Sequence, residues 1–429
     1  MTFNGVNGSM QSPDQMRSTD AVHAKAAPAR RRVVVTGLGA VSGFGLGAAA
    51  LWQGIASAQS AVRPIANMPT GHVDRLGGEI TGYVEADHFT RGEGAMLDKV
   101  SKIAVVSARL AAESAKLGKP DIAAVGRRAG VIYGASPGQE TLDNGYLDLY
   151  GKQVRRLHPF TVPRILPAGP AAAVSIEFGA RGPCFGTASA CATSTHAIGL
   201  GFDMIRAGRI DLCLVGGADA SIVYGYVRAW EALRLLANDL PRPFSRDRTG
   251  IVLGEGAATL VLEERDHAIA RGAPILAELL GFGMTADAVD MVAPDAVSAA
   301  DAMQDAITDA GLTQADIGYV NAHGTGTRVN DRTEVAALHA VFNGAVPPTS
   351  SLKSQLGHTL NAAGAMESIA TILALQHQVL PPTINYREPD PDCPIDCVPN
   401  AARPASFTVA MMNSLGFGGL NAVLVFARA

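Results

Sequence analysis

Two stretches far apart in the chain share one pattern, a cluster of glycines followed directly by an apolar run of strand length. The first is GEGAATLVLEE (Gly254 to Glu264) and the second is GFGGLNAVLVFAR (Gly416 to Arg428). Glycines ahead of apolar and β-branched residues are typical of a tight turn that leads into a buried strand. The repetition favours an internally duplicated chain; chance similarity between two Gly-rich turns is the alternative.

A longer order of elements also occurs twice. Residues 98–118 and residues 298–312 each show helical spacing of apolar residues and a glycine stop. A short strand and a Gly-rich turn follow each helix, at 128–136 and at 316–326. Helices that alternate with strands predict an α/β fold with mostly buried sheets. We expect two duplicated halves, 32–265 and 266–429, packed sheet to sheet in a five-layered α-β-α-β-α core.

Composition supports a large core and excludes some classes of partner. The chain has 429 residues, of which 48% are hydrophobic and 17% are charged, and its net charge is -4. This balance gives no strong overall field for binding nucleic acid, and no apolar run is long enough to span a membrane. We expect a cytoplasmic protein whose residues 1–31 form a flexible tail. A transit peptide is the less favoured alternative, because Asp14 and Asp20 interrupt this segment.

The cysteines indicate a reducing compartment. There are five of them, an odd and low number for this length, which disfavours a disulfide framework. Cys393 and Cys397 have three residues between them and no nearby histidine, so we interpret them as loop thiols; a zinc site is the less favoured interpretation.

Cys191 lies in the small-residue segment TASACATSTHAIGLG, at the start of a stretch with helical spacing. A thiol at the N-terminus of a helix lies near free N–H groups, which stabilise the thiolate. This segment alone is equally consistent with a small core cysteine. His196 is not expected to be its base, because five helical residues rotate the side chain by about 140°.

Two histidines occupy Gly-rich turns in the second half of the chain. His323 lies in NAHGTGTRVNDRTE, and His358 lies in SSLKSQLGHTLNAAGAMESI, five residues after Lys353. A histidine at a helix N-terminus tends to stay neutral, so that one ring nitrogen can donate a hydrogen bond. Each histidine alone is more often structural, but together with Cys191 they suggest an active site. The glycine hinge around Phe417, NSLGFGGLN, can present a backbone N–H to an oxyanion.

From about Arg32 to the C-terminus the sequence resembles the elongating β-ketoacyl-acyl carrier protein synthases, which are condensing enzymes with the thiolase fold. The similarity rests on motifs that occur in the family's order and spacing. They are RRVVVTGLGAVS, SACATSTHAIG, LVGGADA, RPFSRDRTGIVLGEGAATLVLEE, NAHGTGTRVNDRTE, LKSQLGHTLNAAGAMESI, LPPTINYREPDPDC and NSLGFGGLNAVLV.

The resemblance implies roles for residues that match the family's motifs. Cys191 resembles the acylated nucleophile, and His323 and His358 resemble the pair that drives malonyl decarboxylation. Lys353 resembles the electrostatic lysine, and Glu367 its carboxylate partner.

Further positions match the family around the same centre. Phe417 resembles a mobile gate whose N–H, with that of Cys191, forms an oxyanion hole. The predicted substrate contacts are Thr325, Thr327, Pro137, Leu415 and Gly416, and the predicted supporting acids are Asp331 and Glu334.

The implied reaction is the decarboxylative Claisen condensation of an acyl thioester, held on Cys191, with malonyl-acyl carrier protein in fatty acid elongation. The resemblance implies no metal and no cofactor, an acyl carrier protein as partner, and a homodimer. One alternative is a ketosynthase of a specialised lipid or polyketide pathway. A non-catalytic partner subunit is disfavoured by the intact set of Cys191, His323, His358 and Lys353.

Some positions depart from the family pattern. Pro137 replaces the usual branched residue at the floor of the acyl pocket, and Leu415 and Leu420 replace the usual residues around the gate. We therefore expect an unusual preference for acyl chain length. A basic rim for the acidic carrier protein is predicted at Lys152, Arg155, Arg156 and His158, although a solvated charge run explains them nearly as well.

Overall fold

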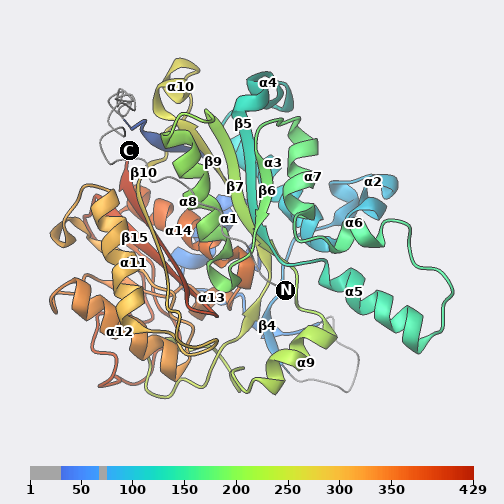
Figure 1. Ribbon diagram of the computed structural model, residues 1–429. Coiled ribbons are helices and arrows are strands. Elements are labelled where there is room, and N and C mark those ends of the chain that lie inside the picture. The colour runs from blue at the N-terminus through green and yellow to red at the C-terminus, as the bar shows by residue number, and fades with distance from the viewer. Residues whose placement is uncertain (1–29, 67–74) are drawn as a thin grey trace, which may run out of the picture. The chain divides into compact units, whose positions relative to one another are not determined.

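The strands of the main sheet are arranged symmetrically about its middle (Figure 1). The computed structural model describes residues 30–66 and 75–429, in which eleven strands form one sheet. The strands of the first half, from the middle outwards, are β1 (Val33–Ser42), β9 (Gly256–Glu264), β7 (Leu212–Asp219), β5 (Ala129–Ala135) and β6 (Cys184–Thr187), and β2 (Gly45–Leu46) pairs with β1. Those of the second half are β10 (Ala277–Ala286), β16 (Leu420–Arg428), β15 (Val409–Gly416), β11 (Tyr319–Asn321) and β12 (Thr349–Ser350).

The two halves of this sheet repeat the same pairing. In each half the first two pairs, counted from the middle, are antiparallel and the next two are parallel. A register shift follows Val35 in β1, and an equivalent shift follows Leu279 in β10. β1 and β10 also pair with each other over three residues, so the two predicted sheets are joined into one. Pattern reasoning did not foresee this junction.

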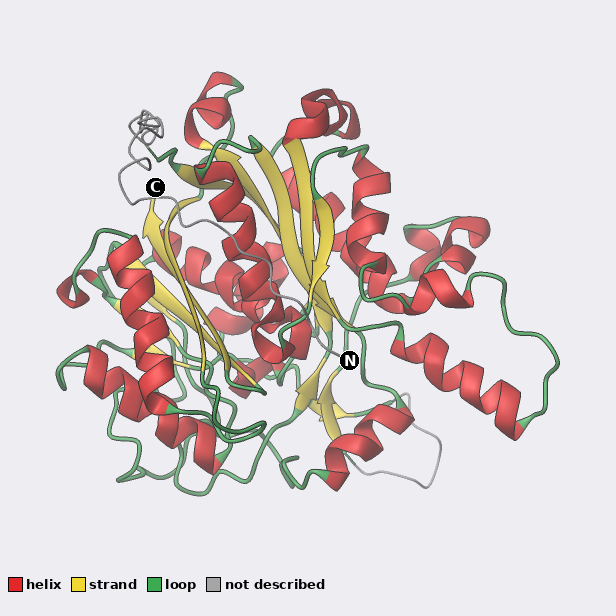
Figure 2. Cartoon of the chain, viewed as in Figure 1, coloured by secondary structure: helices red, strands yellow, loops and turns green. Residues whose placement is uncertain are grey.

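Helices cover both outer faces of the sheet and fill the space between its halves (Figure 2). α3 (Lys99–Ser114) and α7 (Gly169–Phe178) pack on the outer face of the first half, and α11 (Ala296–Asp309) and α12 (Arg328–Val341) on that of the second. α8 (Thr193–Arg206) and α14 (Ala363–His377) lie between the halves. The predicted five-layered α/β core is confirmed.

The two helices predicted from apolar spacing form at the expected places. α3 begins after Asp98, whose carboxylate accepts the N–H of Val100, and α11 begins after Asp295, whose carboxylate accepts the N–H of Ser298. Such caps satisfy backbone donors that would otherwise lack partners at a helix start. Local sequence therefore specifies both helix starts.

Close helix–sheet packing depends on glycines at equivalent positions of the two halves. A Cβ added at Gly37 in β1 would lie 2.1 Å from the carbonyl oxygen of Ala111 in α3. A Cβ added at Gly281 in β10 would lie 2.2 Å from the carbonyl oxygen of Ala306 in α11. Neither position can accept a larger side chain unless helix and strand move apart.

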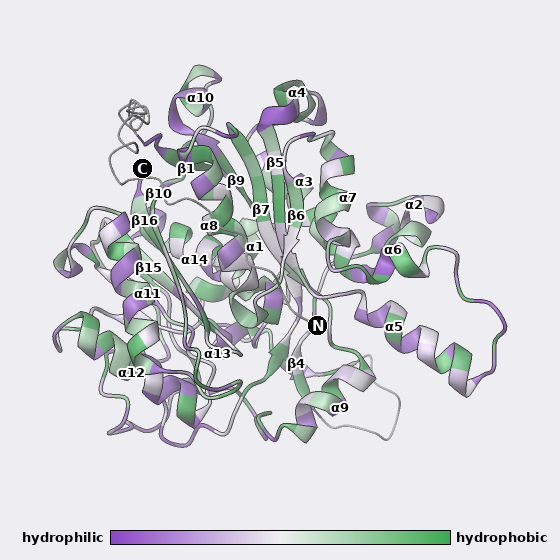
Figure 3. Cartoon of the chain, viewed as in Figure 1, coloured by the Kyte–Doolittle hydropathy of each residue, from purple (hydrophilic) through white to green (hydrophobic). Residues whose placement is uncertain are grey.

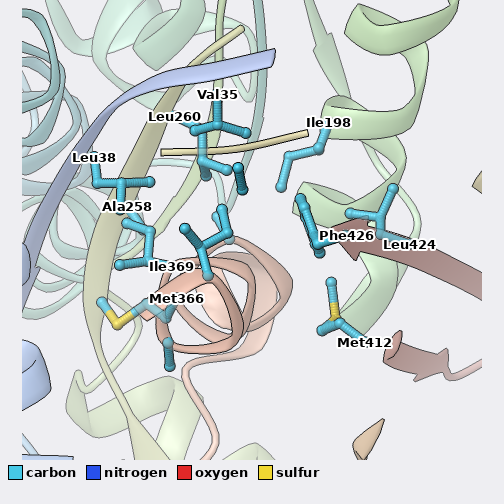
Figure 4. Packing of buried hydrophobic residues seen from close by; sticks show 14 of the residues in the cluster. Val35, Leu38, Ile198, Ala258, Leu260, Met366, Ile369, Met412, Leu424 and Phe426 are labelled. Atoms are coloured by element: carbon cyan, nitrogen blue, oxygen red, sulfur yellow. The ribbon is translucent and has the colours of Figure 1, made fainter. Parts of the chain in front are cut away.

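The central core joins both halves. Figure 4 shows Val35 and Leu260 from the first half-sheet and Met412 from the second converging on Ile198 of α8 and Ile369 of α14. β1, β7 and β9 are buried along their whole length. Their apolar sequence is visible in Figure 3 and agrees with the prediction of strands covered on both faces.

The remaining elements are short. The other helices are α1 (Ala48–Ala56), α2 (Arg91–Met96), α4 (Lys119–Val125), α5 (Gln139–Tyr146), α6 (Thr161–Ile165), α9 (Tyr224–Ala232), α10 (Arg265–Ala270) and α13 (Lys353–Leu356). The other strands are β3 (Arg63–Pro64), β4 (Leu76–Gly78), β8 (Leu253–Gly254), β13 (Val379–Leu380) and β14 (Arg403–Pro404). Among the described residues, no helix is both long and apolar enough to cross a membrane. Of the predicted tail, residues 1–29 lie outside the described residues.

Candidate active site

Cys191 lies where the sequence placed it, in a turn between β6 and α8. It is the middle residue of the 3-10 turn η5 (Ala190–Ala192), which runs directly into α8. Ala190 has a positive φ of 48°, which is uncommon for a residue with a Cβ and indicates a turn held by its surroundings. Cys191 is 6% exposed and lines a cavity of about 540 Å³.

His358 directs one ring nitrogen at the thiol. Its Nε2 lies 2.9 Å from the Sγ of Cys191. Its Nδ1 accepts the backbone N–H of Leu360 at 3.2 Å, so the proton of the neutral ring resides on Nε2. The ring therefore offers a donor, rather than a base, to the sulfur and to a substrate carbonyl beside it.

His323 completes the arrangement from the end of β11. Its ring meets that of His358 edge to face, with 5.4 Å between the ring centroids. Burial, Lys353 and His358 hold the pKa of His323 well below its ordinary value, and burial and Lys353 do the same for the pKa of His358. Both rings are thus neutral hydrogen-bonding groups.

Donor atoms of Cys191, His323 and His358 all lie within 4.8 Å of one another, a spacing that could hold a metal ion. The hydrogen-bond pattern does not suit a metal, because the Nε2 of His358 that faces the sulfur carries a proton and the cation of Lys353 lies nearby. The cluster fits a negatively charged substrate group better than a cation.

Burial and nearby hydrogen-bond donors or positive charges have opposite effects on the pKa of the Cys191 thiol. Burial raises the pKa of its thiol to about 11, while Lys353 and the backbone N–H of Phe417 act to lower this pKa. The resting side chain is therefore a thiol. Any reaction in which this thiol loses its proton therefore depends on these donors to stabilise the sulfur.

Lys353 and Glu367 form a buried ion pair between α13 and α14. Burial raises the pKa of Glu367 to about 7, against the opposing effect of Lys353. The predicted pairing of these two residues is present in the structure.

The two acidic residues after the histidine motif hold the turn that carries His323. Glu334 accepts the backbone N–H groups of His323 and Gly324, each at 2.8 Å. Asp331 accepts the N–H of Gly326 at 3.1 Å and contacts the buried guanidinium of Arg248. Both carboxylates thus brace the turn from α12, and neither lines the cavity.

The cavity brings together most of the predicted substrate-contacting residues. Phe417 stacks on Trp230, with 5.7 Å between the ring centroids, at its wall. The predicted residues that line it are Cys191, His323, Thr325, Thr327, His358, Leu415, Gly416 and Phe417.

Other predicted residues lie elsewhere. Pro137, half-buried after β5, is not among the residues that line this cavity, and neither are Lys152, Arg155, Arg156 and His158. Lys152 instead pairs with Asp148.

The histidine next to the cysteine motif and the two late cysteines also lie apart from the centre. The His196 ring contacts Ser189 and the Ala192 carbonyl rather than the thiol. Cys393 and Cys397 are buried free thiols.

Three neighbours of the centre were not singled out from the sequence. They are Trp230 behind Phe417, Asp219 at the end of β7, and Asn361 beside His358. The only available signal was an acid at the end of an apolar segment, in LVGGADA, which sequence reasoning used as a motif without a role for Asp219.

Comparison with known proteins agrees with this arrangement. The model of the β-ketoacyl synthase N-terminal domain matches residues 30–268, and the model of the C-terminal domain matches residues 276–387. Nodulation protein E of Rhizobium sp. (strain N33) is 44% identical over 402 residues, which cover 93% of this chain and 99% of that protein. The 3-oxoacyl-[acyl-carrier-protein] synthase 2 of Staphylococcus aureus (strain N315) is 39% identical over 409 residues, covering 93% and 98%.

A solved structure extends the comparison to three dimensions. It is a type II polyketide ketosynthase in complex with its acyl-carrier protein and bound to the hexaketide. It is 30% identical and superposes with a TM-score of 0.85, covering 93% of this chain and 100% of that one.

Proposed function

The chain belongs to the β-ketoacyl synthase family, and on that premise we propose that Cys191, His323 and His358 are the residues that carry out its condensation reaction. The reaction joins an acyl thioester to malonyl-acyl carrier protein and yields 3-oxoacyl-acyl carrier protein. The observation that carries the assignment is the meeting of Sγ and the Nε2 of His358 at 2.9 Å in a cavity that His323 also lines.

In the first step the sulfur of Cys191 attacks the carbonyl carbon of the acyl thioester. The new C–S bond replaces the bond to the carrier thiol, which leaves with the proton that the cysteine loses. The negative oxygen of the intermediate is held by the N–H groups of Cys191 and Phe417. Each such donor contributes on the order of 3 kcal/mol to the transition state.

In the second step malonyl-acyl carrier protein enters the same cavity. The neutral His323 and the Nε2–H of His358 donate to its thioester carbonyl, so that loss of carbon dioxide leaves an enolate. The enolate carbon attacks the carbonyl carbon of the acyl group on Cys191, a new C–C bond replaces the C–S bond, and the sulfur leaves as a thiolate that takes up a proton from water. These steps need neither a metal nor an organic cofactor. Thr325 and Thr327, whose hydroxyls are 3.0 Å apart at the cavity wall, would hold the pantetheine arm.

The partner we propose is an acyl carrier protein, as in the related polyketide ketosynthase that was solved with its own. We also propose a homodimer. Among the described strands β6 is the outermost of its half-sheet, and its free edge suits pairing with a second copy. Three apolar side chains near this edge are exposed: Phe160 just before α6, Val162 on α6 and Ile176 on α7. Such a partner would cover them. Location in the cytoplasm remains a prediction.

A specialised pathway is the second candidate. It is favoured by the nodulation protein E relative, which is 44% identical to this chain whereas the 3-oxoacyl-[acyl-carrier-protein] synthase 2 relative is 39% identical, and by the likeness to the polyketide ketosynthase structure. The prediction that Pro137 reshapes the acyl pocket belongs to this candidate. P137I is expected to shift the product chain length, and an unchanged length distribution would remove this role.

The experiment that tests the function offers the protein a mixture of acyl-carrier proteins and measures the mass of the acyl group trapped on Cys191. Malonyl-carrier protein is then added, and the 3-oxoacyl product is measured. Acylation of Cys191 followed by condensation is the expected result. Absence of acylation at Cys191 would contradict the assignment, and the trapped mass separates the two candidate pathways.

A further inference from the structure

A buried carboxylate from the first half of the chain reaches the histidine turn of the second half. Asp219 is the last residue of β7 and is completely buried. It accepts the side-chain amide of Asn361 at 2.8 Å, the backbone N–H of Asn361 at 3.3 Å and the N–H of Ser221 at 3.0 Å. Hydrogen bonds to a charged acceptor in a buried site are strong, so this contact fixes Asn361 firmly.

The turn that Asp219 holds is strained. Leu360, between His358 and Asn361, has a positive φ of 46°. This conformation costs a residue with a Cβ on the order of 1–2 kcal/mol and persists only where neighbours hold it. The carboxylate contact to the next residue is such a restraint.

The strained residue supplies the bond that fixes the histidine tautomer. The N–H of Leu360 donates to the Nδ1 of His358, which keeps the proton on the Nε2 that faces Cys191. If the turn relaxed, the ring could place its proton on Nδ1 and turn a lone pair towards the sulfur and the substrate carbonyl. That tautomer could no longer donate to either group.

We propose that Asp219 is a positioning residue for condensation, which holds the 358–361 turn so that His358 keeps its Nε2–H directed at Cys191 and at the substrate. The proposal rests on the function assigned above, since it concerns the same histidine and thiol. Asp219 does not line the cavity and touches no reacting atom in this scheme.

The negative charge of Asp219 and its proposed positioning role have opposite effects on the pKa of the Cys191 thiol. Among the groups that face Cys191, Lys353 lowers the thiol pKa, whereas the charges of Glu367 and Asp219 raise it. A purely electrostatic role predicts that removing this charge lowers the pKa of Cys191. The positioning role predicts that the pKa rises, because the donor from His358 is lost.

The test measures alkylation of Cys191 by iodoacetamide against pH, read as the mass of the Cys191 peptide so that Cys184 does not interfere. In D219N we expect the apparent pKa of Cys191 to rise and alkylation near neutral pH to slow about tenfold, the effect of one lost hydrogen bond to a charged group. An unchanged or lowered pKa in D219N would overturn the proposal.

Two further variants make the result specific. N361A removes the other side of the contact and should slow alkylation in the same direction, and the double variant should be no slower than the slower single one. N361A also tests the proposal if D219N fails to fold. The matched control is E263Q, which removes a buried carboxylate of β9 that bonds to Arg271 and should lower thermal stability while leaving alkylation unchanged. Additive slowing in the double variant would also overturn the proposal.

Alkylation needs no carrier protein, so this result is independent of the condensation assay. Wild-type protein that is alkylated normally but does not condense would contradict the proposed function alone. Condensation by D219N at the wild-type rate would contradict the positioning role alone.

Discussion

The turn that carries Cys191 and the turn that carries Asn361 have the same backbone structure, one in each half of the chain. Each is a 3-10 turn, η5 or η7 (Leu360–Ala362), that leads into an inner helix, α8 or α14. Each begins with a non-glycine residue at positive φ, 48° at Ala190 and 46° at Leu360. Cys191 and Asn361 therefore occupy equivalent positions in the two halves.

The difference between the turns lies in what they present and what holds them. The first presents a thiol, and the N–H of Phe417, just after β15 of the second half, points at it. The second presents an amide, which Asp219 at the end of β7 of the first half holds. The two similar halves thus form a symmetric scaffold in which each half braces the other's turn, while only the turn of the first half presents a thiol.

The largest expected effect comes from substituting the central residue of each turn, because the two substitutions should reduce condensation by very different amounts. C191A should lose acyl-enzyme formation and reduce condensation by more than about a thousandfold, because no other group can take the acyl chain. N361A should cost only about tenfold, since it removes a brace. Mass spectrometry of the acyl-enzyme and product assays measure both.

A thiol-directed reagent of the cerulenin type supplies the check on this comparison. Its adduct is expected on Cys191. Labelling of Cys184 or Cys213 in preference to Cys191 would contradict the nucleophile assignment.

The second prediction separates the contributions of the two halves to the reaction. H323A should reduce malonyl decarboxylation by about a hundredfold or more, because a donor to the forming enolate is lost, while acylation of Cys191 persists in part. Release of carbon dioxide from malonyl-carrier protein and the mass of the acyl-enzyme measure the two steps. Full decarboxylation by H323A would remove its role.

The third prediction concerns an ionic network at Glu263, a position of the first half-sheet whose equivalent in the second half-sheet carries no charge. Glu263 in β9 bonds to Thr36, His267 and Arg271, whereas the equivalent residue of β16 is Ala427. Burial alone would raise the pKa of Glu263, but these bonds outweigh it and lower the pKa from 4.5 to about 2. The stabilisation is therefore complete above pH 4.5, the value for the unfolded chain, and is lost as the pH falls towards 2.

The difference between these pKa values corresponds to on the order of 3 kcal/mol of unfolding free energy. Denaturant unfolding across this acid range should show a steep loss in wild-type protein and a flatter profile in E263Q. Equal slopes for the two proteins would contradict the role of Glu263.

The smallest expected effect tests the symmetry of the scaffold itself. G37A and G281A should destabilise the protein by similar amounts, about 1–3 kcal/mol each, because both place a Cβ against a helix carbonyl. G92A is the control, since nothing lies within 4 Å of its added Cβ. Thermal unfolding measures all three, and unequal losses for G37A and G281A would show that the halves pack differently.

Much of the fold could be predicted from local sequence. The helical spacings with their glycine stops, the Gly-rich turns and the paired strand motifs predicted the duplicated halves and the five layers, because these features depend on spacing along the chain. Cys191, His323 and His358 could be named because each lies in a recognisable turn after a strand, and the cavity now joins them. Pro137 and the basic segment at 152–158 could not be placed, because no local pattern says which residues line a cavity.

The sequence by itself determined several helix and strand segments, the Gly-rich turns that join them and the residue types that stand in those turns. Only the tertiary structure decided that β1 pairs with β10, that Asp219 holds Asn361, and that the proton of His358 resides on Nε2. Asp219 and Asn361 are far apart in the chain, so their contact exists only once the two half-sheets pack against the inner helices. The tautomer in turn follows from one backbone N–H, whose direction depends on a φ angle that no sequence pattern specifies.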